Sequence, residues 1–452
     1  MNLPPSFVDY MRALIGPTEY EKLESSLQLD PPSSLRVNEM KLEKNHSAYG
    51  SSPEQIVEPS FYKRLSAANR VLWAKTGYYL DDRLTYTFDP LFHAGCYYVQ
   101  EASSMFLEQA VKQYIKSPSI MLDLCASPGG KSTHACSVLP QGSLLVSNEL
   151  MRNRSQVLAE NLTKWGSPNV VVANNSPADY TVLTDFFDVI LTDVPCSGEG
   201  MFRKDPVAVK EWSPENVENC WQRQRTIIAD IWPALKPGGI LIYSTCTFNA
   251  KEDEENIHWI SDQYGAEMLR LRVEEDWNIT GALLQADGTS IIPPITVGKE
   301  YKGEPMYHFF PYKSKGEGFF LAVLRKPGTP DDSSDYSYSL SKSSGKKEKN
   351  KKGAVSSGTV SKENMSIAKS WLKEEVVDDY ELLAIGSSIR AFPKQYMNQL
   401  IVLKQHLRIV QAGITVGEVK GNDLIPAHAL AMCPSLLRPD AFQTEELSYE
   451  QA

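Results

Sequence analysis

The chain has 452 residues, of which 42% are hydrophobic and 23% charged, and its formal net charge at pH 7 is −10. This length exceeds one ordinary domain, and the composition is typical of folded globular domains. No run of about 18 apolar residues predicts a spanning helix, and the N-terminus lacks the charged start and apolar block of a secretory signal. We therefore expect a cytoplasmic protein with no membrane partner. The negative charge argues mildly against nucleic-acid binding, although a basic face can sit on an acidic body.

The seven cysteines are scattered along the chain, and none forms a CxxC pair. An odd number without paired spacing predicts neither a disulfide framework nor a zinc ribbon. The seven histidines are equally dispersed, with no pair at metal-ligand spacing on one helix face. We expect a reduced monomer without a metal, in which isolated cysteines remain candidates for nucleophiles.

In chain order, residues 1–95 predict a small, mixed and mostly helical N-terminal domain, with Pro31-Pro32 as a break. Residues 96–327 alternate short apolar runs with helical patterns, which predicts an α/β domain with a mainly parallel sheet. Ser213-Pro214 fits a helix start, and the KPGG sequence at 236–239 a helix stop. The expected strands are 119–124, 143–149, 169–174, 187–193, 239–245 and 319–324, and the expected helices are 151–165, 214–235 and 252–264.

The last third of the chain divides at a segment that is rich in Gly, Ser and Lys. Residues 328–362 have almost no large apolar side chains and predict a flexible linker. Residues 363–452 predict a compact tail domain with β-like pieces at IVLK (401–404) and RIVQAGITVGEV (408–419) and a helix near 426–432.

A glycine loop follows the first strand of the α/β domain. Two glycines let a backbone approach a ligand closely, and the start of the next helix presents free N–H groups. Glu149 follows the second strand, where an acidic side chain can accept both ribose hydroxyls of a nucleoside. Asp193 ends the fourth strand over the same crevice. The loop residues expected to hold a nucleoside cofactor are Cys125, Ala126, Ser127, Pro128, Gly129, Gly130 and Lys131.

The same loop has one rival interpretation, a P-loop ATPase. Gly130-Lys131-Ser132 and the VILTD sequence at 189–193 resemble its two phosphate motifs. That motif needs a glycine five residues before its second glycine, and position 125 is Cys. The nucleoside interpretation is therefore favoured.

Two cysteines follow neighbouring strand ends beside this crevice, Cys196 after the fourth strand and Cys246 after the fifth. A thiolate that adds to carbon 6 of cytosine makes carbon 5 reactive toward a methyl sulfonium. An acid near ring N3, where Asp193 is placed, helps the addition. Spacing alone does not decide which of the two cysteines attacks.

In these motifs the chain resembles the Nop/Sun family of RNA 5-methylcytosine methyltransferases. The matching segments are RVN (36–38), YYVQEASSM (97–105), LDLCASPGGKSTH (122–134), NE (148–149), TDVPCSGEGMFRKDP (192–206), YSTCTFNAKEDEENI (243–257) and GEGFFLAVLRK (316–326). The resemblance implies a class I, Rossmann-like methyltransferase with a mainly parallel seven-stranded sheet and a small N-terminal α+β RNA-binding part. It implies S-adenosylmethionine at residues 125–131, Glu149 and Asp193.

The resemblance also ranks the two cysteines. Cys246 would be the nucleophile that forms an adduct with cytosine C6, Cys196 would assist release of the methylated base, and Asp193 would complete the catalytic set. The implied substrate is 16S ribosomal RNA, with transfer RNA second. A catalytically silent RNA-binding relative is the third alternative, and the presence of both cysteines argues against it.

Further expectations follow from the resemblance outside the catalytic loops. Arg36 and Asn38 match the family's RNA-contacting N-terminal segment. Independently of the resemblance, Arg203 and Lys204 follow Cys196 and are candidates to bind the phosphate beside the target, with a surface salt bridge as the alternative for each. The tail at 363–452 resembles a PUA-like RNA-binding domain. The chain departs from the family after the third strand, where the usual adenine-side Asp is replaced; Asn175, Ser176 or the backbone could substitute.

Overall fold

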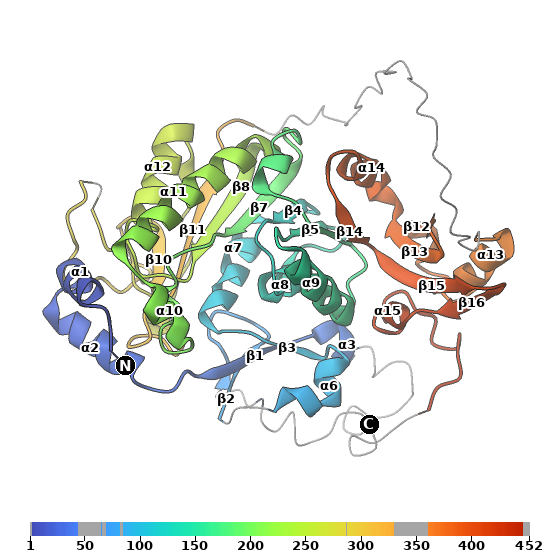
Figure 1. The fold of residues 1–452 in the computed structure, drawn as a ribbon, viewed down its shortest axis with the longest axis horizontal. Helices are drawn as coiled ribbons and strands as arrows, with labels where there is room; N and C mark the ends of the chain where they lie inside the picture. The colour runs from blue at the N-terminus through green and yellow to red at the C-terminus, as the bar shows by residue number, and fades with distance from the viewer. Residues whose placement is uncertain are drawn as a thin grey trace.

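The computed structural model describes residues 2–43, 65, 69–81, 85–285, 287–329 and 360–445 (Figure 1). Most of the predicted linker, residues 330–359, lies outside these described residues. None of the described helices is long and apolar enough to cross a membrane.

The N-terminal region combines helices with a three-stranded antiparallel sheet of order β2-β1-β3. The α+β character is confirmed, although the region is less helical than the sequence pattern predicts, because strands of three to five residues show little periodicity. The elements are α1 (Pro5–Ile15), α2 (Pro17–Leu27), β1 (Ser33–Val37), α3 (Glu39–Glu43), β2 (Gly77–Leu80), α6 (Pro90–His93) and β3 (Tyr97–Val99).

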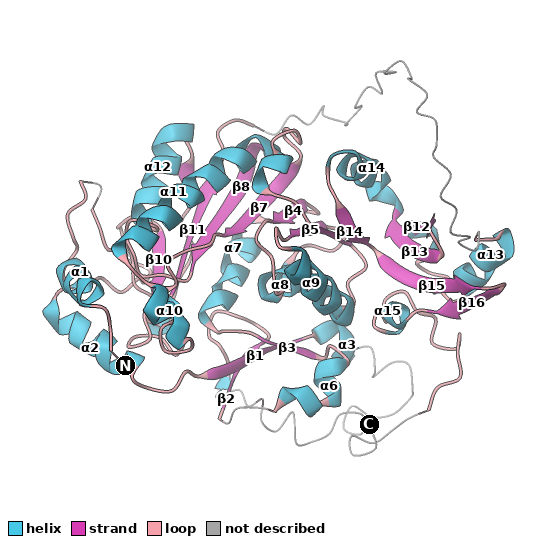
Figure 2. Cartoon of the chain, viewed as in Figure 1, coloured by secondary structure: helices cyan, strands magenta, loops and turns pink. Residues whose placement is uncertain are grey.

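The central sheet has nine strands, magenta in Figure 2, in the order β10-β11-β8-β7-β4-β5-β6-β14, with β9 also paired to β11. The five strands from β6 to β8 are parallel, and β11 runs against β8. The mainly parallel sheet is thereby confirmed, but it has nine strands rather than seven because β9 and β14 extend it. The bounds are β4 (Ile120–Asp123), β5 (Leu144–Asn148), β6 (Val170–Ala173), β7 (Phe187–Asp193), β8 (Leu235–Thr245), β9 (Glu267–Met268), β10 (Met306–Phe309), β11 (Phe319–Arg325) and β14 (Ile409–Ala412).

Helices cover both faces of this sheet. Successive strand residues such as Met121 and Leu122 point to opposite faces, and each belongs to a different apolar core. The first core contains residues of α7 (Leu107–Tyr114), α8 (Gly130–Val138) and α9 (Arg152–Trp165). The second contains residues of α11 (Pro214–Ile231), α12 (Glu254–Tyr264) and α14 (Met397–His406).

The three helices expected at 151–165, 214–235 and 252–264 are confirmed as α9, α11 and α12. Ser213 caps α11 as predicted, because its side chain accepts a hydrogen bond from the Asn216 N–H. The predicted stop is wrong: α11 ends at Ile231, and the KPGG sequence lies within β8. A short α10 (Pro206–Glu211) precedes α11.

The C-terminal region has its own four-stranded antiparallel sheet of order β12-β13-β15-β16 and a small apolar core. The prediction of a strand at the IVLK sequence is wrong, since these residues lie in α14. The 408–419 segment is extended as predicted, but it divides at Gly413, where φ is 63° and an added Cβ would lie 2.1 Å from the Ala391 carbonyl oxygen. The elements are α13 (Lys362–Ser370), β12 (Tyr380–Ile385), β13 (Ser388–Pro393), β15 (Ile414–Lys420), β16 (Asp423–Pro426) and α15 (His428–Ala431), the last confirming the helix expected near 426–432.

The division at Gly413 lets the two halves of this extended segment join different sheets. β14 pairs with β6 at the edge of the central sheet, and β15 lies inside the C-terminal sheet (Figure 1). A strand of the C-terminal region therefore forms one edge of the central sheet, whose strand ends carry the loops of the predicted site.

Candidate active site

The glycine loop joins β4 to α8 at the carboxyl edge of the parallel strands. Gly129 has φ 115°, a conformation that side-chain-bearing residues rarely adopt, and Gly130 opens α8. The Ala126 N–H donates to the Asn148 carbonyl oxygen at 2.8 Å, which fixes the loop against the end of β5. The loop therefore presents backbone groups and the start of α8 at the edge where ligands of such sheets bind.

Behind the loop, Ser132 faces the interior. Its hydroxyl donates to Asp123 at 2.6 Å, and both side chains are buried. Burial raises the pKa of Asp123 to about 7. Because the Ser132 hydroxyl faces the interior and is hydrogen-bonded to Asp123, it is not placed to bind a magnesium ion as a P-loop serine does. The resemblance of Gly130-Lys131-Ser132 to a P-loop therefore no longer supports an ATPase.

Glu149 lies at the end of β5 with 4% of its surface exposed. One carboxylate oxygen accepts from the Met151 N–H at 2.8 Å. The other lies 3.6 Å from the Arg154 guanidinium, longer than a hydrogen bond. Glu149 thus keeps the acceptor capacity that a ribose hydroxyl would use.

The two residues considered as substitutes on the adenine side already have partners. The side chain of Asn175 bonds to the backbone N–H and C=O of Arg408, at 2.8 and 3.2 Å. The Ser176 hydroxyl forms a capping box with Asp179. The backbone of this segment is the remaining substitute for the missing Asp.

Cys196 and Cys246 meet at the ends of β7 and β8. Asp193 pairs with Ser244 in the parallel ladder, so the loops that follow the two strands start side by side. The two sulfur atoms lie 3.2 Å apart, and the Cys246 N–H donates to the Cys196 sulfur at 3.4 Å. Both side chains are half-buried. The structure thus brings together the two cysteines that were predicted separately.

The charges around the two thiols differ. Lys131 pairs with Asp193 at 2.8 Å; burial alone would lower the pKa of Lys131, but the charge and hydrogen bond of Asp193 outweigh burial and raise it. Cys246 also interacts electrostatically with Lys131, and a nearby ammonium stabilises a thiolate.

At Cys196 the surroundings act in the opposite direction. The hydrogen bond to the Cys246 sulfur, burial and the negative charge of Glu252 raise the pKa of Cys196 well above its ordinary value. Cys196 is therefore held as a protonated thiol, whereas the Cys246 sulfur interacts with the Lys131 ammonium. Sequence reasoning assigned Lys131 to the cofactor loop and missed the role of its side chain beside Asp193.

Two buried carboxylates brace the cysteine loops, and the sequence motifs indicated neither. Glu199 accepts from the Phe248 N–H at 3.1 Å and from the Asn249 side chain at 3.0 Å. Glu252 accepts from the Ser197 N–H at 3.0 Å. Each carboxylate therefore connects the loop that contains Cys196 with the loop that contains Cys246. Glu199 lies in the first loop and bonds to the second, and Glu252 follows the second loop and bonds to the first.

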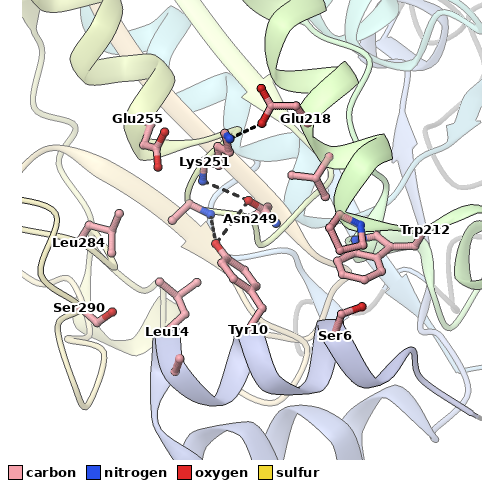
Figure 3. Close-up of a pocket in the computed structure, with 14 residues that line it drawn as sticks. Ser6, Tyr10, Leu14, Trp212, Glu218, Asn249, Lys251, Glu255, Leu284 and Ser290 are labelled. Carbon is pink, nitrogen blue, oxygen red and sulfur yellow. Dashed lines mark hydrogen bonds and ion pairs between the residues drawn. The ribbon is translucent and has the colours of Figure 1, made fainter.

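The N-terminal helix α1 supports the Cys246 loop from outside. Tyr10 accepts from the Ala250 N–H at 2.9 Å and donates to Asn249 at 3.3 Å (Figure 3). These residues border an open cavity of about 580 Å³, where Lys251 pairs with Glu218. Helix α1 is thus fixed to the segment that positions Cys246.

Arg36 and Asn38 are completely buried, so the prediction that they contact RNA is wrong. The Arg36 guanidinium donates to Thr133 of α8 at 2.6 Å and lies 4.3 Å from the ring centre of Trp165. The Asn38 amide donates to the Gly95 and Trp165 carbonyl oxygens. These side chains join the N-terminal sheet to α8 and α9.

Arg203 and Lys204 border a groove of about 1200 Å³ that Pro31, Tyr86 and Lys315 also line. The Arg203 side chain is only 6% exposed and pairs with Glu317 at 2.7 Å, whereas that of Lys204 is 29% exposed and lies 3.8 Å from the same carboxylate. Of the two, Lys204 is the one with surface available to a phosphate.

Comparison with known proteins gives matches over both the N-terminal and the catalytic regions. The family model described as "16S rRNA methyltransferase RsmB/F" matches residues 114–325, and the model of the "N-terminal domain of 16S rRNA methyltransferase RsmF" matches residues 3–102. The chain is 31% identical over 338 residues to "Ribosomal RNA small subunit methyltransferase F" of Pectobacterium atrosepticum, covering 73% of this chain and 63% of that protein. The protein of the same name from Escherichia coli O9:H4 is 31% identical, with 72% and 63% covered. The chain thus spans less than two thirds of these relatives.

Solved structures share the fold. A methyltransferase homologue from Pyrococcus horikoshii matches with a TM-score of 0.54 and 27% identity, covering 72% of this chain and all of that one. NSun6 from the same organism, solved "with SFG", matches with a TM-score of 0.54 and 19% identity, covering 72% and 99%. With both family models matched along the chain, it belongs to the RsmB/F family of methyltransferases.

Proposed function

We propose that the protein is an S-adenosylmethionine-dependent RNA cytosine-C5 methyltransferase that acts on 16S ribosomal RNA through a covalent bond between Cys246 and cytosine C6. The observation that carries the proposal is the pair of thiols 3.2 Å apart beside the Lys131–Asp193 ion pair. The family match and the names of the curated relatives support methyl transfer to small-subunit ribosomal RNA.

The residues at the carboxyl edge fit S-adenosylmethionine. The backbone of residues 125–131 would hold the cofactor near the start of α8, and Glu149 would accept the ribose hydroxyls with its free oxygen. Asp193 forms an ion pair with Lys131 of this loop and therefore borders the same space. When bound, this cofactor supplies an electrophilic methyl group on a sulfonium.

The chain's own residues account for the addition step. The Cys246 thiolate, stabilised by the Lys131 charge, adds to C6 of the base, and the electrons of the C5–C6 double bond become available at C5. Asp193 and Lys131 lie beside the sulfur, where they can bond the polar edge of the base around N3. C5 is then the carbon that accepts the methyl group.

The release step follows from the sulfur pair. Cys196 lies 3.2 Å from the Cys246 sulfur, so it borders the adduct that Cys246 forms with C6. After its own proton has passed to solvent, the Cys196 thiolate takes the proton from C5. The C5–H electrons re-form the C5–C6 double bond, the bond from C6 to Cys246 breaks, and Cys246 leaves as a thiolate.

The target base must leave its stack to reach two half-buried sulfurs, so unpaired or loosened RNA is favoured. The N-terminal domain (1–95) and the PUA-like domain (363–452), which frame the catalytic domain (96–327), would hold the surrounding RNA. Lys204 would contact a phosphate in the groove. A ribosomal RNA substrate implies a cytoplasmic location.

The proposal is tested by transfer of a labelled methyl group from S-adenosylmethionine to RNA purified from cells that lack the protein. We expect label in 16S ribosomal RNA, at a cytosine that bisulfite sequencing finds unmodified in those cells. Label in transfer RNA instead would make that RNA the substrate. No transfer to any unmodified RNA would support the catalytically silent alternative.

A further inference from the structure

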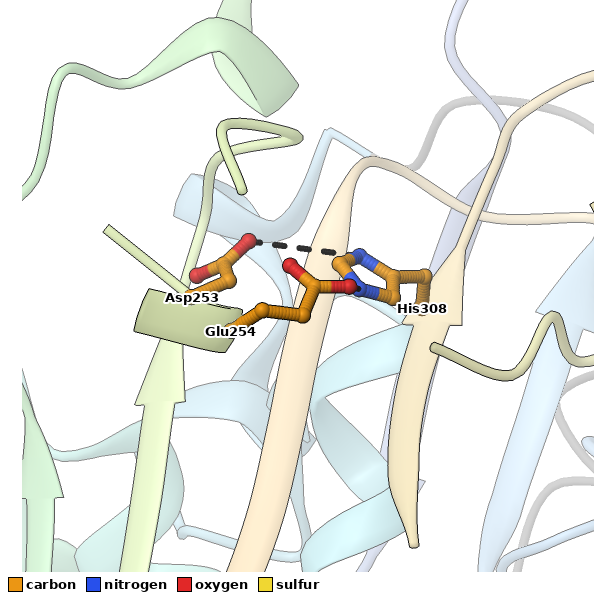
Figure 4. A group of neighbouring side chains, drawn as sticks. All are labelled: Asp253, Glu254 and His308. Carbon is orange, nitrogen blue, oxygen red and sulfur yellow. Dashed lines mark hydrogen bonds and ion pairs between the residues drawn. The ribbon is translucent and has the colours of Figure 1, made fainter. Parts of the chain in front are cut away.

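Asp253, Glu254 and His308 form a buried group that the proposed reaction does not use. Asp253 and Glu254 lie at the start of α12, and their carboxylates point toward the imidazole of His308 in β10 (Figure 4). None of the three has exposed surface. His308 Nε2 lies 2.8 Å from Glu254 Oε1, and His308 Nδ1 lies 3.9 Å from Asp253 Oδ2.

Each of the three side chains has one partnered and one unpartnered polar atom. Asp253 Oδ1 accepts from the Thr245 hydroxyl at 2.7 Å, and Glu254 Oε1 accepts from the Leu283 N–H at 2.7 Å. Within the described residues of the chain, no hydrogen-bond partner reaches Asp253 Oδ2, Glu254 Oε2 or His308 Nδ1. Buried polar atoms without partners are rare in folded proteins, and three of them facing one another are most simply explained by a shared ion or an ordered water.

Thr280 adds a separate observation on the same side. It faces His308 across a two-residue antiparallel bridge, with N–H to C=O distances of 2.9 and 2.8 Å. Directly opposed residues in such a bridge project their side chains to the same face. Thr280 Oγ1 is also completely buried and lacks a partner among the described residues. A fourth unsatisfied atom thus lies on the His308 side.

We propose that Asp253, Glu254 and His308 bind one divalent transition-metal ion, with zinc as the best fit. One donor atom from each residue lies within 4.8 Å of the others, so inward shifts of up to about 0.7 Å would bring all three to zinc-bonding distance. One imidazole and two carboxylates are ligands that zinc accepts. The ion would balance the charge that both carboxylates carry when they are ionised.

The surrounding bonds match those of metal ligands in proteins. Ligand carboxylates are themselves hydrogen-bonded, as Asp253 is by Thr245 and Glu254 by the Leu283 N–H. Thr245 directly precedes Cys246, so the ion would hold the end of β8 in place. Its role is structural and does not depend on the proposed reaction. The sequence prediction of a metal-free protein rested on helix-face spacing, and this set joins adjacent residues to a strand 54 positions away.

A second buried pair provides a matched control. His134 lies 3.0 Å from Glu108, their side chains are 0% and 1% exposed, and His134 Nδ1 also has no partner among the described residues. The other Glu108 oxygen accepts from Lys112 and the Lys75 N–H, and among the described residues no second carboxylate joins the pair at metal-ligand distance. A buried histidine–glutamate pair alone should therefore bind no ion.

The test uses the full-length, tag-free protein grown with added zinc, dialysed, and analysed for metal by mass spectrometry. We expect one equivalent in the wild type and in His134→Gln, and less than a tenth in His308→Gln. Full retention of the metal by folded His308→Gln overturns the proposal, as does a metal-free wild type that stays empty after incubation with zinc, manganese or cobalt.

Cobalt replacement in the wild type decides the question even where the variants do not fold. Visible cobalt bands without a thiolate charge-transfer band support nitrogen and oxygen ligands. A thiolate band would assign the ion to cysteines and overturn the proposal.

Discussion

Two regions gather polar side chains against the central sheet, and they differ in what those side chains contact. In the crevice at the ends of β4, β7 and β8, the thiols of Cys196 and Cys246 are half-buried and contact chiefly each other. At the junction of β1 with α8, Arg36 is completely buried and its guanidinium bonds to Gln100 and Thr133. Both regions match family motifs. Exposure and unused bonding capacity separate the residues that we propose to react from the residues that hold the N-terminal sheet against the central domain.

Replacing Cys246 should give the largest loss of activity. We expect Cys246→Ser to reduce methyl transfer at least about 10³-fold, because a hydroxyl in this position is a far weaker nucleophile. Cys96→Ser, a half-buried cysteine of the N-terminal region, serves as the control and should keep wild-type activity. Single-turnover transfer of labelled methyl to RNA measures both. Full activity in Cys246→Ser would remove this residue from the reaction.

Replacing Lys131 should give the next largest loss, about 10²-fold, since the ammonium beside Asp193 and Cys246 stabilises charge in the addition step. Lys131→Met removes the charge and keeps a side chain of similar length, so the rate of the addition step should fall more than the affinity for S-adenosylmethionine. Single-turnover rates and a cofactor titration measure the two effects. Reduced cofactor binding with an unchanged rate at saturating cofactor would assign Lys131 to the cofactor alone.

Arg36→Met should affect stability rather than RNA binding. The change removes the donor to Gln100 Oε1 and one donor to the Thr133 hydroxyl, and should cost about 3 kcal/mol in the free energy of unfolding. Urea titration measures this cost, with the exposed Arg70→Met as the control, which should change stability by less than about 0.5 kcal/mol. A loss of RNA affinity at unchanged stability would restore the RNA-contact interpretation.

Lys204→Ala should give the smallest effect, a two- to fivefold weaker affinity for RNA, which corresponds to roughly one phosphate contact. The slope of log affinity against log salt concentration should become shallower by about 1. The reason is that Lys204 is partly exposed and only loosely paired with Glu317. Filter binding at several salt concentrations measures the slope. Lys299→Ala, at an exposed lysine that is not among the groove-lining residues, should leave it unchanged.

The sequence predicted the central fold well because its strands are buried apolar runs and its helices have clear periods. It failed where short elements depend on tertiary contacts: the strands of the N-terminal sheet are three to five residues long, and IVLK is an apolar run that fits a helix as well as a strand. The edge strand β14 was expected to be extended, but its partner β6 lies more than 200 residues earlier, and no local pattern identifies it.

The candidate site was predicted unevenly for a similar reason. Strand-end positions can be located from patterns, so Cys196, Cys246 and Asp193 converge as expected. Burial cannot be read from a motif, and Arg36 and Asn38 were therefore placed on RNA although they are internal. Glu199 and Glu252 were missed because an acidic residue in a polar loop looks like an exposed one until its backbone partners are known.

The division of labour between the two sulfurs is tested most directly by trapping the covalent adduct. Cys196→Ala, incubated with S-adenosylmethionine and unmodified RNA, is run on a denaturing gel beside the Cys196→Ala/Cys246→Ala double variant. We predict a shifted protein–RNA band in the single variant and none in the double variant, because Cys246 forms the adduct and Cys196 is needed to resolve it. A shifted band that accumulates in Cys246→Ala instead would show that Cys196 attacks the base, and would contradict the account.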